Sequence, residues 1–217
     1  MTWEVNGITG RGEKPGCAGH QKGLAVVMAT GRCVWDDLLY RFDPEGNHAH
    51  VIAVNNMILH WKGRVHHGVS MHPEEPGLWR ALRPYYQCEL SHVHTHGYRK
   101  HEKLGLQECD YIWDIPAGKG GTSSLLAVFI ALALGFDRVV LCGVPLDGSG
   151  HFYDHPSVQI PVFNSDFLQT EWKKAEKYFA GRVKSVSGRT REWLGEPSED
   201  WLRGKHGDKG GHLQPGA

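Results

Sequence analysis

Short apolar runs that stop abruptly at small or polar residues recur along the chain. The runs at 23–29 (GLAVVMA), 50–55 (HVIAVN) and 138–144 (RVVLCGV) are almost continuously apolar and rich in β-branched residues. Strands buried on both faces carry this pattern, because helices cover both sides of a parallel sheet. Weaker runs of the same kind predict further strands at 64–70, 109–115 and 182–187. The pattern therefore predicts a buried, mostly parallel sheet.

Helix-length segments alternate with these strands. The most apolar one, 125–134 (LLAVFIALAL), follows Thr122 and Ser123, which can cap a helix, and precedes Gly135, which can end one. An all-apolar helix joined by a tight turn to the run at 138–144 is typical of the middle of an α/β sheet. Other helices are expected at 34–41, 74–82, 165–180 and 190–194. The fold class expected is α/β: a Rossmann-like, mostly parallel sheet flanked by helices.

These elements divide the chain into one domain with two loose ends. Residues 1–22 are Gly-rich and polar without a clear period, which predicts a flexible lead-in. Residues 23–203 carry all the expected elements and are interpreted as a single nucleotide-binding domain. The low-complexity segment 204–217 is expected to be a disordered tail. Residues 84–108 show no clean period and are left unassigned.

Charge and cysteine content exclude several classes of protein. Lys and Arg number 24 and Asp and Glu number 24, so a strongly basic nucleic-acid binder is not expected. Five cysteines without a CxxC pair offer no even disulfide framework, which favours buried thiols in a reducing cytoplasm. The longest apolar run, 125–134, is too short for a membrane span. No signal peptide is visible at the N-terminus.

Polar and small residues follow three of the predicted strands. In an open parallel sheet, ligands bind beyond the carboxyl ends of the strands, so these residues are expected to meet at one pocket. Backbone N–H groups at the start of the 125–134 helix could hold an anion there, although capping of the helix explains the same residues. The glycine loops lack the spacing of a P-loop or of a dinucleotide fingerprint. The candidate binding residues are Thr30, Gly31, Arg32, Asn55, Asn56, Gly121, Thr122, Ser123, Ser124 and Gly143.

The segment 147–155 (DGSGHFYDH) concentrates groups that could do chemistry. Asp147, Tyr153 and either His151 or His155 are candidates for catalysis, with a histidine as general base and the tyrosine as a donor to a leaving phosphate. The alternative is a solvated loop with a glycine turn. Because the loop directly follows the predicted central strand, a functional role is favoured.

Three histidines alternate in the unassigned segment. On a strand, His92, His94 and His96 would share one face and could bind zinc. No cysteine partner lies nearby, and histidines with this spacing more often line a solvent-exposed strand face. We therefore expect no metal site.

The order of these elements, with the stretch ALALGFDRVVLCGVPLDGSGHFYD, resembles the bacterial sialyltransferases that use CMP-activated sugars. A wider group of domains with this fold includes archaeal 6-hydroxymethylpterin diphosphokinases and phage proteins labelled as morphogenetic. The resemblance covers 24–187 in element order and is most specific over 122–153. It implies a sialyltransferase-like variant of the GT-A topology.

Family positions map onto residues of this chain one by one. Gly31 matches the second glycine of the family's nucleotide-binding turn, and Asn55 matches its asparagine after the second strand. The helix-start pair Thr122 and Ser123 matches residues that contact the nucleotide. Of the tyrosines that bind the leaving phosphate, Tyr153 is kept.

The resemblance implies a metal-independent glycosyltransferase that uses a nucleotide-activated, CMP-sugar-like donor. A histidine would be the base, no cofactor would be needed, and the acceptor is unspecified. We expect a homo-oligomer in the cytoplasm, or in the host cytoplasm if a phage encodes the chain. Two alternatives stay open: a Mg²⁺-dependent diphosphokinase or other phosphoryl transferase, with Asp114 and Asp147 as metal ligands, and a non-catalytic nucleotide-binding assembly protein.

Overall fold

The computed structural model describes residues 1–11, 13–83, 89–96, 108–115, 122–160, 166–179 and 181–205. Within these ranges, seven parallel strands form one sheet in the order β7-β6-β5-β4-β3-β8-β9. The strands are β3 (Leu24–Met28), β4 (His50–Val54), β5 (Val65–Val69), β6 (Leu90–His96), β7 (Tyr111–Trp113), β8 (Arg138–Cys142) and β9 (Val183–Ser185). The α/β class and the parallel sheet expected from the apolar runs are confirmed.

The strand order reverses next to β3. The chain builds outward from β3 through β4, β5 and β6 to β7, then crosses back to place β8 on the other side of β3. β3 and β8 pair in register from Leu24 with Arg138 to Met28 with Cys142. A reversal of this kind leaves a crevice at the carboxyl ends of the two strands, where ligands bind in open α/β sheets.

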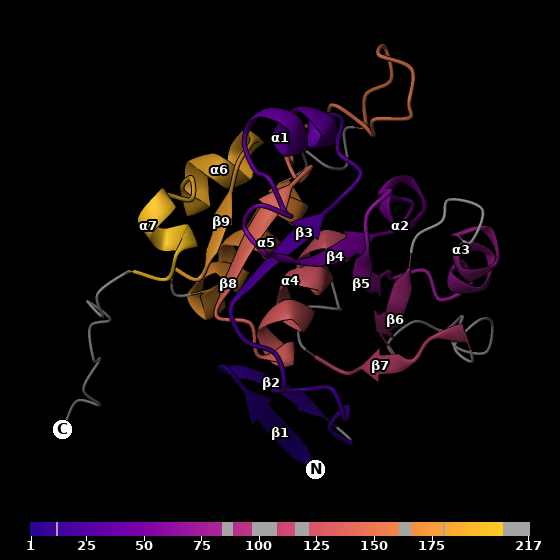
Figure 1. Cartoon of the computed structure of the whole chain (residues 1–217), viewed down its shortest axis with the longest axis vertical. Helices are drawn as coiled ribbons and strands as arrows, with labels where there is room; N and C mark the ends of the chain where they lie inside the picture. The colour runs from indigo at the N-terminus through magenta and orange to yellow at the C-terminus, as the bar shows by residue number, and fades with distance from the viewer. Residues whose placement is uncertain are drawn as a thin grey trace.

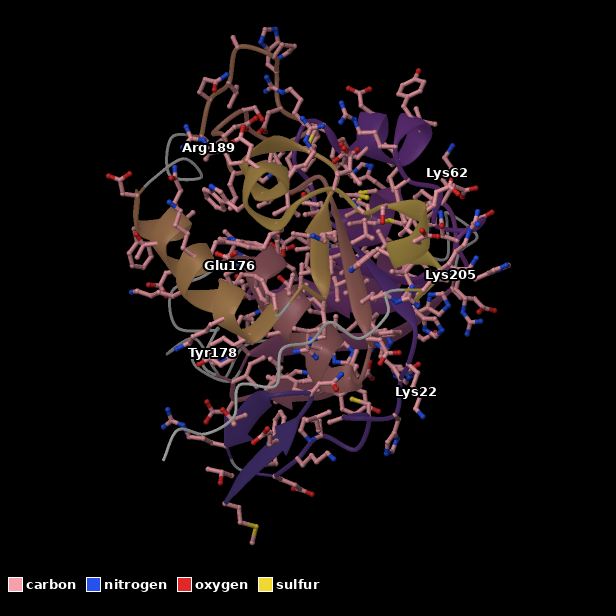
Figure 2. The ribbon with its side chains drawn as sticks, turned by 90° about the vertical axis from the view of Figure 1, so that its left-hand side faces the viewer. Lys22, Lys62, Glu176, Tyr178, Arg189 and Lys205 are labelled. Atoms are coloured by element: carbon pink, nitrogen blue, oxygen red, sulfur yellow. The ribbon has the colours of Figure 1, made fainter. Side chains whose placement is uncertain are left out.

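Helices cover both faces of the sheet. One face packs α4 (Ser123–Leu134) and α5 (Asp166–Phe179), and the other packs α1 (Val34–Tyr40), α2 (Met57–His60), α3 (Pro76–Leu82) and α7 (Glu199–Leu202). A further helix, α6 (Gly188–Leu194), follows the edge strand β9. Figure 2 shows this layering from the β9 side: Glu176 and Tyr178 of α5 lie on the opposite side of the molecule from Lys62, which follows α2.

The all-apolar helix α4 is buried along its whole length. Thr122 caps it, because its hydroxyl accepts a hydrogen bond from the Leu125 N–H at 3.1 Å, and Gly135 ends it in a left-handed conformation. A helix without a polar face needs cover on every side. The sheet and α5 supply part of that cover, and the N-terminal residues supply the rest.

A β-hairpin occupies the region expected to be a loose lead-in. Strands β1 (Thr2–Val5) and β2 (Ile8–Arg11) pair antiparallel and lie against one end of α4, as Figure 1 shows. Ile8 is 1% exposed and belongs to the same core as α4. Strands of four residues carry too little periodicity to be recognised from sequence, and the buried apolar contact with the core is what orders them.

The unassigned sequence segment contains the strand β6, which pairs with β5 and β7. Most of the expected tail, 206–217, lies outside the described residues, as do 84–88 and 97–107. None of the helices in the described ranges has the length and apolar content that crossing a bilayer requires.

Candidate functional site

A cavity of about 490 Å³ lies at the carboxyl ends of four neighbouring strands, β5, β4, β3 and β8. The start of α4 and the loop after β8 complete its wall. Most residues predicted to bind or act on a ligand line this single cavity. They are Thr30, Gly31, Asn55, Asn56, Thr122, Ser123, Ser124, Gly143, Asp147, His151 and Tyr153.

Two predicted site residues, Arg32 and His155, lie elsewhere, and a third, Gly121, lies outside the described residues. The Arg32 guanidinium does not line the cavity and instead donates to the carbonyls of His155, Pro156 and Val158 at 2.7–3.1 Å, which fixes the loop after β8. The exposed His155 is also absent from the lining, and its Nδ1 lies 2.8 Å from the Ser157 hydroxyl.

Gly31 and Gly143 allow two backbone segments, one after β3 and one after β8, to cross in close contact at the floor of the cavity. The Gly31 N–H donates to the Gly143 carbonyl at 2.9 Å. A Cβ on Gly31 would lie 2.5 Å from that same carbonyl oxygen, and a Cβ on Gly143 would lie 2.5 Å from the Ala29 oxygen. Gly143 also has φ of +70°, which a side chain disfavours. Only glycine fits this crossing without displacing backbone.

A buried carboxylate beneath the crossing holds it in place. Asp37, which is 1% exposed, accepts from the Gly143 N–H and from the Ser187 hydroxyl, each at 2.7 Å. Because Ser187 donates to Asp37, the Cys33 thiol donates to Ser187 at 3.1 Å. Burial first, and then Asp37, raises the pKa of Cys33 to about 12, so this thiol stays protonated. Sequence reasoning missed Asp37, since its partners are distant in the chain.

The loop after β8 folds back along the end of β3. Gly31 and His151 form an antiparallel bridge, and the Phe152 N–H donates to the Thr30 carbonyl at 3.0 Å. The side chains of Thr30 and His151 also bond, with Oγ1 and Nδ1 2.8 Å apart. Burial lowers the pKa of His151, and the nearby Asp154 only partly offsets this effect. The imidazole is therefore neutral at pH 7, as a general base must be.

Tyr153 packs beside this histidine. Its ring stacks on His151 with centroids 5.0 Å apart and an interplanar angle of 22°. Burial raises the pKa of Tyr153, while side-chain hydrogen bonds to Asn56 and Thr30 act in the opposite direction. The phenol is protonated at neutral pH and can donate a hydrogen bond.

The start of α4 supports both interpretations of its sequence. The capping role is confirmed for Thr122. The Ser123 hydroxyl accepts from the Met71 N–H at 3.2 Å, which ties α4 to the end of β5. This helix has 12 residues, and its first turn, including the half-buried Ser124, faces the cavity. Its N-terminal N–H groups and dipole favour an anion there.

Sequence reasoning missed the β5 side of the cavity. Met71 and His72 come two and three residues after the end of β5, and Glu75 and Trp79 belong to the α3 region. The rule that ligands bind beyond strand ends would have included Met71 and His72 if it had been applied to the weak run at 64–70.

The two carboxylates named for a magnesium site lie apart. Asp147 lines the cavity, and its Oδ1 accepts from the Ser149 N–H at 2.9 Å. Asp114 follows the edge strand β7, four positions from β3 in the sheet, and does not line the cavity. Among the described residues, no group of three or more His, Cys, Asp or Glu is placed to hold a metal ion.

His94 of β6 lies in a buried hydrogen-bonded chain between Trp113 of β7 and His67 of β5. The Trp113 indole N–H donates to Nδ1 of His94 at 2.9 Å, so the proton of neutral His94 is on Nε2, which lies 2.9 Å from Nδ1 of His67. His96 bonds the Ile115 carbonyl at 3.0 Å. His94 and His96 are buried, so the expected solvent-exposed strand face is wrong for these two histidines, and both nitrogens of His94 bond protein side chains.

Comparison with known proteins adds no relative: no family model, no curated protein and no solved structure matches the chain.

Proposed function

We propose that the protein is a glycosyltransferase of the sialyltransferase-like fold that uses a nucleotide-activated, CMP-sugar-like donor without a metal ion. The observation that carries the proposal is the convergence of Gly31, Asn55 and Ser124 on one cavity at the reversal of strand order. The cavity volume, about 490 Å³, is in the range typical of small-molecule sites. A neutral histidine and a protonated tyrosine stand at its wall.

The phosphate of the donor would lie at the start of α4. There the N-terminal N–H groups and the hydroxyl of Ser124 offer donors, and the helix dipole favours negative charge. The nucleoside would extend across the ends of β3 and β4, where Thr30, Asn55 and Asn56 line the cavity.

The reaction needs one proton acceptor and one stabiliser of the leaving group. An acceptor hydroxyl attacks the anomeric carbon, and the bond from that carbon to the phosphate oxygen breaks. His151 takes the hydroxyl proton, and the departing nucleoside monophosphate keeps the bonding electron pair. The phenol of Tyr153 donates a hydrogen bond to that phosphate. We assign the base to His151 rather than His155, because only His151 lines the cavity.

A negative charge introduced at the start of α4 distinguishes an effect on ligand binding from an effect on folding. Replacing Ser124 by Asp puts a carboxylate in the first turn of the helix, where it favours the fold but repels a phosphate. Thermal shift with millimolar CMP should show stabilisation of the wild type, and UDP, GDP and ATP in the same panel test whether other nucleotides bind. Ser124→Asn, a neutral control of the same size, should keep most of that stabilisation, and Ser124→Asp should lose it.

Two results would count against the proposal. If no nucleotide raises the melting temperature of the wild type, the cavity does not bind nucleotides. If CMP binds but a panel of CMP-sugars shows neither transfer nor hydrolysis, the protein is a non-catalytic nucleotide binder.

A further inference from the structure

The charges around the cavity are unusual for a nucleotide site. Among the described residues that line it, none is Lys or Arg, while both Glu75 and Asp147 are acids. Arg32 follows the cavity residue Gly31 in sequence, but its guanidinium donates hydrogen bonds to three loop carbonyls. The described protein groups therefore offer one feature that attracts an anion, the N-terminus of α4.

Glu75 has no ion-pair partner among the described residues, unlike its sequence neighbour Glu74 and unlike Asp110. In the described part of the chain, its side chain makes no hydrogen bond or ion pair. By contrast, Nδ1 of His72 lies 3.4 Å from a Glu74 oxygen, and Arg80 bonds Asp110. Glu75 is half-buried at the start of α3, where its carbonyl accepts from the Trp79 N–H at 3.1 Å.

The two acids stand at opposite ends of the cavity. Glu75 belongs to the β5 side and Asp147 to the β8 side, with the start of α4 also on the wall. A ligand with one phosphate can place it against the helix start. A second phosphate, extending toward either end, would approach a carboxylate, and the described residues that line the cavity include no Lys or Arg to offset the repulsion.

We propose that Glu75 determines specificity: it accepts hydroxyl or ammonium donors from the ligand and rejects a second phosphate group. This inference rests on the proposed function, since it assumes that a nucleotide occupies the cavity. It predicts that the β5 end of the cavity takes the hydroxyl-bearing part of the donor or acceptor.

Calorimetric titration with CMP and CDP tests the inference, because the two ligands differ only in phosphate number. The wild type should bind CMP about tenfold more tightly than CDP in metal-free buffer, the scale of one partly screened charge contact. Glu75→Gln keeps the size and removes the charge, so it should bring the two affinities to within about twofold. The control Glu74→Gln, which removes a neighbouring charge outside the cavity, should leave the preference unchanged.

Each outcome separates the two claims. If the wild type binds CMP but Glu75→Gln keeps the full preference over CDP, this inference fails and the proposed function stands. If neither nucleotide binds the wild type, the proposed function fails and this inference fails with it. If Glu74→Gln also reduces the preference for CMP over CDP, the preference comes from the general surface charge, and the role of Glu75 is overturned.

Discussion

The hydroxyl of Thr30 and Nδ1 of His151 lie 2.8 Å apart, although the two residues are 121 positions apart in the chain. Thr30 follows the central strand β3, and His151 belongs to the loop after β8. Together with the backbone bridge at Gly31, this contact fixes the imidazole at the wall of the cavity. A proposed base is therefore held by the strand ends on which the ligand would rest.

Replacing His151 should impair transfer more than binding. His151→Gln keeps a polar side chain but removes the base, so we expect the transfer rate to fall by roughly 10²- to 10⁴-fold. Nucleotide affinity should change little, because the proposed phosphate site is at α4. Steady-state kinetics and calorimetry on the same variant measure the two effects.

His155→Gln is the matched control, since His155 is exposed and outside the cavity. It should retain the wild-type rate. Equal losses in the two variants would contradict the assignment of the base to His151.

Acid should destabilise the fold through the buried pair His67 and His94. Burial lowers the pKa of His67 to about 3 and that of His94 well below its ordinary value. The unfolded chain binds protons near pH 6.5 while the folded pair stays neutral, so stability is full above pH 6.5 and is lost as the pH falls. Each histidine should cost about 1.4 kcal/mol per pH unit below that point. Urea unfolding at pH 7.5, 6.0 and 5.0 measures the slope.

His20, which is exposed, provides the comparison for this slope. His20→Gln should leave the slope as it is, whereas His94→Gln should reduce it while lowering stability at pH 7.5. A slope that does not change in His94→Gln would show that other groups cause the acid sensitivity.

Two glycines with similar backbone angles should differ in how they tolerate alanine. Gly143 and Gly181 have φ of +70° and +76°, but only a Cβ on Gly143 meets backbone, 2.5 Å from the Ala29 oxygen. Gly181→Ala should cost about 1 kcal/mol for the backbone angle alone. Gly143→Ala should cost at least about 2 kcal/mol more and should weaken nucleotide binding, since the floor of the cavity must shift. Equal costs in denaturant unfolding would argue against the close crossing.

The parts of the fold whose sequence has a strong local pattern could be predicted. β3, β4, β8 and α4 are continuous apolar runs with clear ends, and each was placed to within about two residues. The rule for strand ends predicts that Thr30 and Asn55 meet at one cavity, and the expected helix start adds Ser123; all three line the cavity.

What the sequence did not predict depends on contacts between distant residues. Asp37 looked like an ordinary acid in a helix, because its bond to Gly143 spans 106 positions. Glu75 lacked any pattern that distinguishes it from Glu74. The hairpin β1–β2 is ordered by its contact with α4, and four-residue strands carry no period that could reveal it.

The reversal of strand order also has a consequence for how the chain acquires its shape. The first strand of the sheet, β3, obtains its second neighbour only when β8 is available, with Leu24 opposite Arg138. During synthesis, the edge of β3 that pairs with β8 stays unpaired while the long segment between the two strands, about half of the chain, is being made. Until β8 arrives, that open side can pair with other chains, so synthesis at high concentration or without chaperones should favour aggregation.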